Sequence, residues 1–409
     1  MRPTRLLASL LAPALTLPCL AQKPPTDTER LAAACNAFAA DLHAALGPTQ
    51  APTCSPGSIA IALLMLLPGA AGATADEIAT VLHLPDDLRG NRMHEAARDL
   101  LQQVGLLLPG SPNRDHEPSP LALTNDLWVQ RGFALVPSYP RLLRASFGAA
   151  KHDVDFAADP DKARTAINLH VAQATGDRIR ELLAEDDVNA LTRVVLTNAL
   201  WFKAGWAHAF TAGNTQDLPF TLADGTTVPV PTMQQQQPFG WAESDAWVAV
   251  SMPFAIGTVQ FEAVVPRDGH TLAEAERALL QRSFGKMANE PVQVALPRFL
   301  VQAAHRLRTP LLALGMRRAF DASADFSGIE PKRELFVDDV VHQTWIQVDE
   351  QGCEAAAATA VVLKVRSAVV QGQPKQFRAD RPFAFGLRDA RTGLLLFVGR
   401  VTDPRSRQS

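Results

Sequence analysis

The chain has 409 residues, well above the usual domain length of roughly 150, so either several domains or one unusually large domain is expected. Apolar residues make up 47% and charged residues 20%, which supplies a globular core and excludes disorder and collagen-like repeats. The formal net charge is -3 and no block of like charges occurs. Neither a nucleic-acid partner nor a membrane surface is therefore expected.

The N-terminal residues follow the order of a secretory signal peptide. Two arginines precede an apolar stretch at 6–17, and Ala21 is a small residue suited to the cleavage site. We therefore expect residues 1–21 to be a signal peptide, residues 22–409 to be one mature domain, and the protein to be secreted or periplasmic. Lipidation of Cys19 and a cytoplasmic N-terminal helix are the alternatives, and the prolines of this stretch argue against both.

The rest of the sequence predicts neither a membrane-spanning segment nor a framework of disulfides. The longest later apolar run covers residues 59–67 and is too short to cross a bilayer, which takes roughly 20 residues. Cys35, Cys54 and Cys353 remain after the signal. A disulfide between Cys35 and Cys54 suits an oxidising compartment, but the sequence does not assign the pairing. A large apolar core must therefore hold the fold together.

Two helices are predicted in the first quarter of the chain. The pair Ser55–Pro56 is a helix-start signal, and residues 58–67 are apolar on every side, as in a helix buried all round. A turn at 69–72 follows. Thr74 and Glu77 then have the spacing of a capping box, which predicts the start of the second helix.

The rest of the chain mixes one more helix with short β-rich runs. The helix is predicted over 162–183, with Gly176 as an interruption. The β-rich runs are 194–202, 247–253, 258–265, 292–300, 340–348, 382–387 and 394–401. Because no βαβα rhythm connects these runs, they can meet only through non-local pairing, which indicates an α+β fold.

The motifs of common enzyme sites are missing or incomplete. The chain has no G-x-S-x-G nucleophile elbow, no phosphate-binding glycine loop and no dinucleotide fingerprint. His94 and Glu95 resemble the start of a zinc-protease helix, but Arg98 stands where the second histidine must coordinate. The ten histidines are scattered singly along the sequence. We therefore expect no enzyme activity, no metal and no cofactor.

The most informative stretch follows Gly352. Four consecutive alanines favour a helix there and the valines after them favour a strand, so the segment conflicts with itself and could be a switch. As a strand, residues 353–365 carry small and apolar side chains on one face, whereas Glu354, Lys364 and Arg366 lie on the other. Such a strand could enter a packed sheet without clashes. An Ala-rich surface linker is the alternative.

Over nearly its whole mature length the chain resembles the serpin family. The matching segments, in chain order, are 55–59, 69–82, 197–206, 296–299, 341–342, 349–360, 378–385 and 394–404. The resemblance implies an α+β fold of three β-sheets surrounded by helices, with an exposed reactive-centre loop at about 350–377. Cys353 departs from the Thr or Ser that is usual at this hinge position, His170 departs from the usual Trp, and Asp177 departs from the usual Gly.

The resemblance also implies how the loop works. The scissile bond is expected between Arg366 and Ser367, with Lys364 as the alternative residue before the cut. An arginine there suits a protease pocket with a carboxylate at its base, so the implied partner is a trypsin-like serine protease. The hinge that inserts into the central sheet comprises Glu350, Gly352, Cys353, Glu354, Ala355, Ala356, Ala357, Ala358 and Thr359.

Two groups of residues are implied to control the opening of the central sheet. At the top of the sheet, Arg298 is expected to pair with Glu350 beneath Trp206 and to hold a gap shut, so that loss of the pair favours premature insertion. Under the middle of the sheet, a buried hydrogen-bonded cluster is expected at Ser55, Ser58, Asn198 and His342.

The expected function is suicide inhibition by a monomeric, secreted serpin of the bacterial type. The protease would form an acyl-enzyme with the loop and be trapped when the cleaved loop inserts. Two alternatives stay open. The chain could be a non-inhibitory serpin that acts as a binding, chaperone or storage protein, or it could be a cross-class inhibitor of a cysteine protease. The absence of bulky, charged or proline residues at 355–358 favours inhibition.

Overall fold

The computed structural model describes residues 24–47, 53–105, 121–255, 258–353 and 373–405. The predicted signal peptide lies outside these residues, as do hinge residues 354–359 and the predicted scissile bond with its alternative at Lys364. Among the helices that the structure describes, none combines the length and apolarity needed to span a bilayer.

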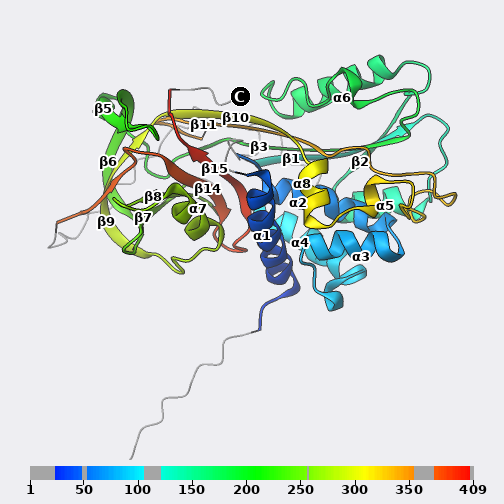
Figure 1. Cartoon of the computed structure of the whole chain (residues 1–409), viewed down its shortest axis with the longest axis horizontal. Coiled ribbons are helices and arrows are strands. Elements are labelled where there is room, and N and C mark those ends of the chain that lie inside the picture. Colours follow the sequence, from blue (N-terminus) through cyan, green and yellow to red (C-terminus); the bar gives the residue numbers. More distant parts are fainter. Residues whose placement is uncertain (1–23, 48–52, 106–120, 256–257, 354–372, 406–409) are drawn as a thin grey trace, which may run out of the picture.

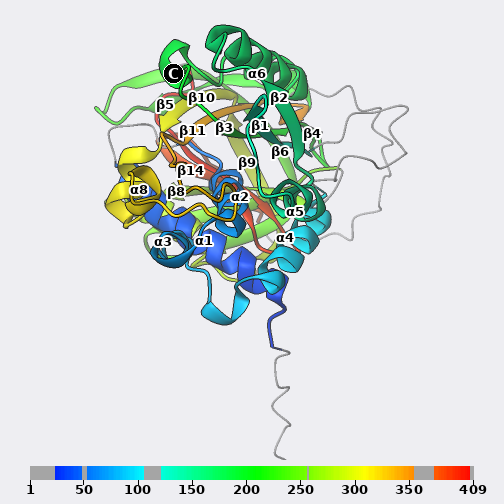
Figure 2. The same ribbon diagram turned by 90° about the vertical axis from the view of Figure 1, so that its right-hand side faces the viewer.

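The helices lie on both sides of a sheet layer (Figure 1). One of them, α6, lies alone above strands β1, β2 and β3, and the turned view in Figure 2 shows it on the same outer side, with the other helices of that end beneath the strands. The α-helices of the described residues are α1 (Asp27–Leu46), α2 (Pro56–Leu66), α3 (Gly72–Val81), α4 (Asn91–Val104), α5 (Ser138–Phe147), α6 (Pro160–Ala174), α7 (Leu272–Leu280) and α8 (Arg308–Leu314).

The strands form three hydrogen-bonded sheets, with orders β2-β1-β3, β10-β11-β12-β4 and β13-β9-β6-β7-β8-β14-β15, with β5 added to β6. Their bounds are β1 (Leu121–Gln130), β2 (Ala150–Val154), β3 (Val194–Phe202), β4 (Ala204–Gly205), β5 (Gln216–Thr221), β6 (Thr227–Glu243), β7 (Trp247–Pro253), β8 (Val259–Pro266), β9 (Ala288–Pro297), β10 (Phe299–Arg306), β11 (Val341–Val348), β12 (Gly352–Cys353), β13 (Lys375–Arg378), β14 (Phe383–Asp389) and β15 (Leu395–Val401). The α+β class and the three sheets predicted for the chain are confirmed.

The predicted buried helix is α2, which contacts both β3 and β15. Ser55 caps it, since the Ser55 hydroxyl accepts a hydrogen bond from the backbone N–H of Ser58 at 3.3 Å, and Pro56 begins the first turn. Gly57 allows close packing on β15, because a Cβ there would lie 2.9 Å from the carbonyl oxygen of Leu395. The helix therefore sits at the centre of the molecule, between two sheets.

The predicted capping box at Thr74 and Glu77 is wrong, since α3 already begins at Gly72. The Thr74 hydroxyl instead accepts a hydrogen bond from the backbone N–H of Asp325 at 3.0 Å, and the Glu77 carboxylate accepts one from the N–H of Arg317 at 2.8 Å. Both side chains thus satisfy backbone groups of a distant segment. Capping-box spacing is a local pattern and does not show this competing tertiary use.

The helix predicted over 162–183 ends early, at Ala174. Gly176 and Asp177 follow with φ values of 57° and 64°, in the left-handed region where an α-helix cannot continue. The glycine that serpins usually have at 177 would adopt this conformation with less strain than aspartate.

The predicted strands mostly match, but one of them is divided and several strands, among them β1, β2 and β5, were not predicted. The ranges predicted at 194–202 and 247–253 are β3 and β7, but the run predicted at 292–300 is divided at Arg298 into β9 and β10. The long strand β6 was not predicted, because its prolines and its run of four glutamines weaken the β-pattern of the sequence.

Candidate functional site

The candidate site is β12, at the start of the predicted reactive loop, together with the strands around it. β12 is a two-residue strand that lies between β11 and β4, antiparallel to both. Cys353 pairs with Val348 on one side and Ala204 on the other, and Gly352 pairs with Gly205. The resemblance implied a hinge that inserts once the loop is cleaved. In the structure of the uncleaved chain, Gly352 and Cys353 of this hinge already form a strand.

Close packing explains why these two residues are small. Gly352 has a φ of 150°, and a Cβ added to it would lie 2.0 Å from the carbonyl oxygen of Ala204, so only glycine fits. The Cys353 side chain is 1% exposed and packs in the main core. Cys353 therefore defines which face of the strand points inward.

Below β12, strands β3 and β11 belong to separate sheets and no hydrogen-bonded ladder joins them in the described residues. We call the line between them the β3–β11 seam. Val341 of β11 packs against an apolar cluster that includes Val171 of α6 and Ala199 of β3, so apolar side chains from both strands and from α6 meet at the seam. A strand that continued from β12 would enter this seam.

At the top of the sheet, Arg298 contacts Glu350 as predicted. The Arg298 Nε donates to the Glu350 carboxylate at 2.7 Å, and its Nη2 and the hydroxyl of Thr215 donate to the same oxygen. Burial raises the pKa of Glu350, but the hydrogen bonds from Arg298 and Thr215 outweigh burial and hold this pKa below its usual value. The contribution of Thr215 was not predicted, because no local pattern places it here.

Trp206 holds the turn that joins β11 to β12. Its indole N–H donates to the carbonyl of Asp349 at 2.8 Å, its backbone N–H donates to the carbonyl of Gln351 at 2.9 Å, and its ring stacks on Phe254 at 4.8 Å. The Arg298–Glu350 pair and Trp206 therefore hold the turn that precedes β12, whose residues Gly352 and Cys353 already lie between β11 and β4. The predicted role of the pair in restraining further insertion stays a prediction.

Under the middle of the sheet, the four predicted residues meet in one hydrogen-bonded cluster. The backbone N–H of Ser55 donates to Nε2 of His342 at 2.9 Å, and the Ser55 hydroxyl donates to the carbonyl of Leu396 at 2.6 Å. The hydroxyl of Ser58 donates to the side-chain carbonyl of Asn198. The cluster thus connects α2 to β11 on one side of the seam and to β3 on the other.

Two residues that sequence reasoning missed extend this cluster. Thr344 of β11 places its hydroxyl 2.8 Å from Nε2 of His342. The Asn198 amide donates at 2.7 Å to Asn125 of β1, which in turn donates to the carbonyl of Phe147 at 2.9 Å. The spacing of Thr344 two residues after His342 was the available signal, because residues i and i+2 share a strand face.

His342 is a neutral acceptor in this cluster. Burial of the ring, together with the charge of His305, lowers the pKa of His342 from 6.5 to about 3. Nε2 can therefore accept the hydrogen bond from Ser55 throughout the neutral pH range.

The two N-terminal cysteines are separate buried thiols. Cys35 and Cys54 form no disulfide, and burial raises the pKa of each thiol to about 12. The pairing considered from the sequence is therefore not formed, and the core holds this part of the chain without it.

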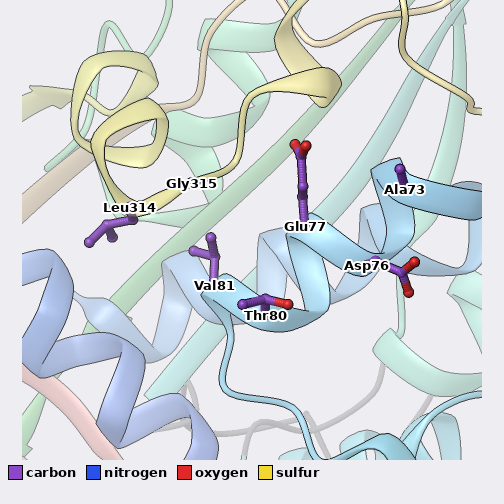
Figure 3. A pocket seen from close by; sticks show the side chains of 7 residues that line it. All are labelled: Ala73, Asp76, Glu77, Thr80, Val81, Leu314 and Gly315. Atoms are coloured by element: carbon purple, nitrogen blue, oxygen red, sulfur yellow. The ribbon is translucent and has the colours of Figure 1, made fainter.

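A hollow of about 230 Å³ lies between α3 and the end of α8 (Figure 3). Its two carboxylates come from Asp76 and Glu77, and Glu77 is already engaged by the backbone of Arg317. The hollow takes no part in the site described above.

Comparison with known proteins connects this geometry to a family. The family described as Serpin (serine protease inhibitor) matches residues 33–404. The chain belongs to the serpin family. An uncharacterized serpin-like protein of Thermococcus kodakarensis is 37% identical over 91% of this serpin and 85% of its own length. The leukocyte elastase inhibitor of Bos taurus is 32% identical over 92% of this chain and 100% of its own length.

Among solved structures, this serpin is similar to Serpin48, described as a highly specific serpin in the insect Tenebrio molitor. The two are 29% identical with a TM-score of 0.77, over 92% of this chain and 98% of the insect protein. These relatives come from an archaeon, a mammal and an insect, so they do not single out a bacterial type.

Proposed function

We propose that this serpin is a suicide-substrate inhibitor of trypsin-like serine proteases. The observation that carries the proposal is β12, which has the position and direction of a strand about to lengthen into the β3–β11 seam. Only Glu354 separates it in the sequence from the run of four alanines at 355–358.

The direction in which the Cys353 side chain of β12 points also supports insertion of the loop as a strand. Cys353 points into the core, and side chains alternate along a strand, so residues 355, 357 and 359 would also point inward if β12 lengthened. These residues are Ala355, Ala357 and Thr359, which a packed sheet can accept without rearrangement. The outward face would carry Glu354, Ala356 and Ala358.

The chemistry begins as ordinary proteolysis. The protease serine attacks the carbonyl carbon of Arg366, the peptide bond to Ser367 breaks, and the amine of Ser367 leaves with a proton from the protease histidine. The ester that remains joins the protease to the new C-terminus at Arg366. Because residues 352 and 353 already lie in the sheet, insertion of residues 354–365 at roughly 3.3 Å each would then carry the protease roughly 40 Å along the sheet. Water would release it only if it reached the ester before insertion finished.

A protease incubation tests the proposal. With trypsin we expect a covalent complex that survives boiling in detergent, and a released C-terminal fragment that starts at Ser367 by mass spectrometry. A fragment that starts at Val365 would move the bond to Lys364. Clean cleavage without any complex would instead support the non-inhibitory alternative, and a stable complex with a papain-like protease would support cross-class inhibition.

A pair of loop variants tests the insertion step. Thr359→Arg places a charge on the face that must be buried, at a cost of several kcal/mol, so this variant should be cleaved without forming a complex. Ala358→Arg places the same charge on the opposite face and should inhibit like the parent. Equal inhibition by both variants would contradict insertion by the assigned face.

We also propose that the chain is exported as a monomer to a secreted or periplasmic location. The order of charged, apolar and small residues at 1–21 supports export. Expression with the native N-terminus should yield extracytoplasmic protein that starts at Gln22, whereas retention of Met1 on intracellular protein would contradict the proposal.

A further inference from the structure

Three side chains that can bind metal meet between α6 and the sheet beneath it. Nε2 of His152 on β2 donates to one carboxylate oxygen of Asp126 on β1 at 2.8 Å, and Nε2 of His170 on α6 donates to the other at 2.9 Å. All the potential ligand atoms lie within 4.8 Å of one another. None of these residues takes part in the site described above.

The arrangement is built into the fold and open to solvent. The Asp126 side chain is only 3% exposed, whereas those of His152 and His170 are 29% and 34% exposed. Trp128, the cross-strand partner of His152, stacks on the His152 ring at 4.2 Å and touches the His170 ring edge-on at 5.3 Å. One tryptophan thus orients both imidazoles toward the buried carboxylate.

We propose that Asp126, His152 and His170 form a binding site for a divalent transition-metal ion, with Zn²⁺ the best match. The two imidazole nitrogens favour Zn²⁺ over Mg²⁺ or Ca²⁺, which bind oxygen ligands, and Zn²⁺ also accepts a carboxylate oxygen. Ligand atoms around tetrahedral Zn²⁺ are about 3.3 Å apart, given bonds of about 2.0 Å. The two separations between Nε2 and carboxylate oxygen are 2.8 and 2.9 Å, and no pair of ligand atoms is more than 4.8 Å apart, so side-chain movements would bring the three ligands around one ion, with the fourth position left for water.

Binding also needs a change of tautomer that the exposure of the rings allows. Each Nε2 now carries the proton that it donates to Asp126, and a metal ligand needs a free lone pair on that nitrogen. On each ring the proton must leave Nε2 and another must bind Nδ1. Solvent can exchange these protons, because both rings are partly exposed. Sequence reasoning treated the histidines as scattered and predicted no metal, because residues 126, 152 and 170 meet only through the β1–β2 pairing and the docking of α6.

The ion would fasten α6 to one side of the β3–β11 seam. His170 is next to Val171, which belongs to the same apolar cluster as Ala199 of β3, and Val341 of β11 packs against that cluster. A strand that enters the seam must therefore displace contacts made by α6. Metal at His170 would tie this helix to β1 and β2, so we expect bound Zn²⁺ to slow loop insertion, a consequence that rests on the proposed inhibitory function.

A titration of the tag-free chain with Zn²⁺ alone tests the site. We expect about one equivalent to bind, and at least a tenfold loss of affinity in His152→Asn and in His170→Asn. His208→Asn, at an exposed histidine elsewhere in the chain, should bind like the parent. Co²⁺ in place of Zn²⁺ should give the visible absorption of a low-symmetry site, and this absorption should be absent from His170→Asn. No binding by the parent, or unchanged binding by both site variants, would overturn the proposal.

A separate measurement tests the consequence. The rate of covalent complex formation with trypsin should fall several-fold with one equivalent of Zn²⁺, recover with chelator, and be insensitive to Zn²⁺ in His170→Asn, which also controls for effects on the protease. Zn²⁺ binding without any effect on this rate would support the metal site but contradict the proposal that bound Zn²⁺ slows loop insertion. If no complex forms under any condition, the inhibitory function fails, while the titration still decides the metal site.

Discussion

Replacement of Gly352 by alanine tests whether β12 is part of the sheet before cleavage. The added methyl carbon would lie 2.0 Å from the Ala204 carbonyl oxygen and 2.7 Å from the Cα of Gly205. Both are backbone atoms, so no side chain can rotate out of the way. The variant must therefore either distort β4 or release β12 from the sheet.

The energies favour release. Overpacking costs about 1–3 kcal/mol, and a non-glycine residue at a φ of 150° adds about 1–3 kcal/mol of strain. Against this, β12 gains about 1 kcal/mol for each net hydrogen bond and about 1 kcal/mol from burial of the small Cys353 side chain. A shift of only 1.4 kcal/mol toward release changes the exposed population tenfold.

The Cys353 thiol reports the release directly. In the parent it is 1% exposed, so a thiol reagent under native conditions should label it slowly, and at least about ten times faster in Gly352→Ala. Cys35 and Cys54 are buried with pKa values near 12 and should stay unlabelled, which peptide mass spectrometry can verify. Gly213→Ala is the matched control, since a Cβ there meets nothing within 4 Å. Equal labelling of Cys353 in the parent and in Gly352→Ala, with unchanged thermal stability, would refute the assignment of β12.

Three further predictions concern the rest of the site. Burial lowers the pKa of His342 to about 3 in the folded chain, against 6.5 ordinarily. Between these two pH values the unfolded chain binds one more proton than the folded chain. The free energy of unfolding should therefore fall as the pH drops from about 6.5 to about 3, by up to about 1.4 kcal/mol per pH unit. Urea unfolding should show a shallower pH dependence in His342→Gln, and identical slopes would exclude this histidine as the cause. Glu350→Gln weakens the ion pair with Arg298, and because the Arg298 side chain is 46% exposed, the loss should be about 1 kcal/mol. On warming, the uncleaved variant should lose inhibitory activity by premature insertion faster than the control Glu95→Gln, which changes an exposed residue. Equal rates of loss would show that the pair does not restrain the loop. Arg366→Ala should abolish complex formation with trypsin and permit it with an elastase-like protease, and an undiminished trypsin complex would place the scissile bond elsewhere.

Local patterns were sufficient for much of the fold. The Ser55–Pro56 start of α2 and the bounds of β3 and β7 were predictable, because capping chemistry and β-propensity act over a few neighbouring residues. The family was recognisable for the same reason, since its motifs are short and occur in order. The alternation of the loop segment was also readable, because the period of a strand is two residues whatever the sheet around it.

Contacts between distant segments were beyond reach of the sequence. Thr215 at Glu350 and Asn125 at Asn198 depend on strand register, which no local propensity specifies. The early end of α6 was only partly predictable: Gly176 was expected to interrupt the helix, but the positive φ of Asp177, which ends it there, was not.

The sequence by itself determined that this chain is a serpin whose segment after Gly352 is rich in small residues. Tertiary structure alone decided that Gly352 and Cys353 already lie in the sheet, because the space beside Ala204 admits a glycine and nothing larger. It also decided that Asp126, His152 and His170 meet, because parallel pairing of β1 with β2 and the docking of α6 bring together side chains far apart in the chain. Packing and register act between segments, whereas sequence patterns report only what neighbours along the chain prefer.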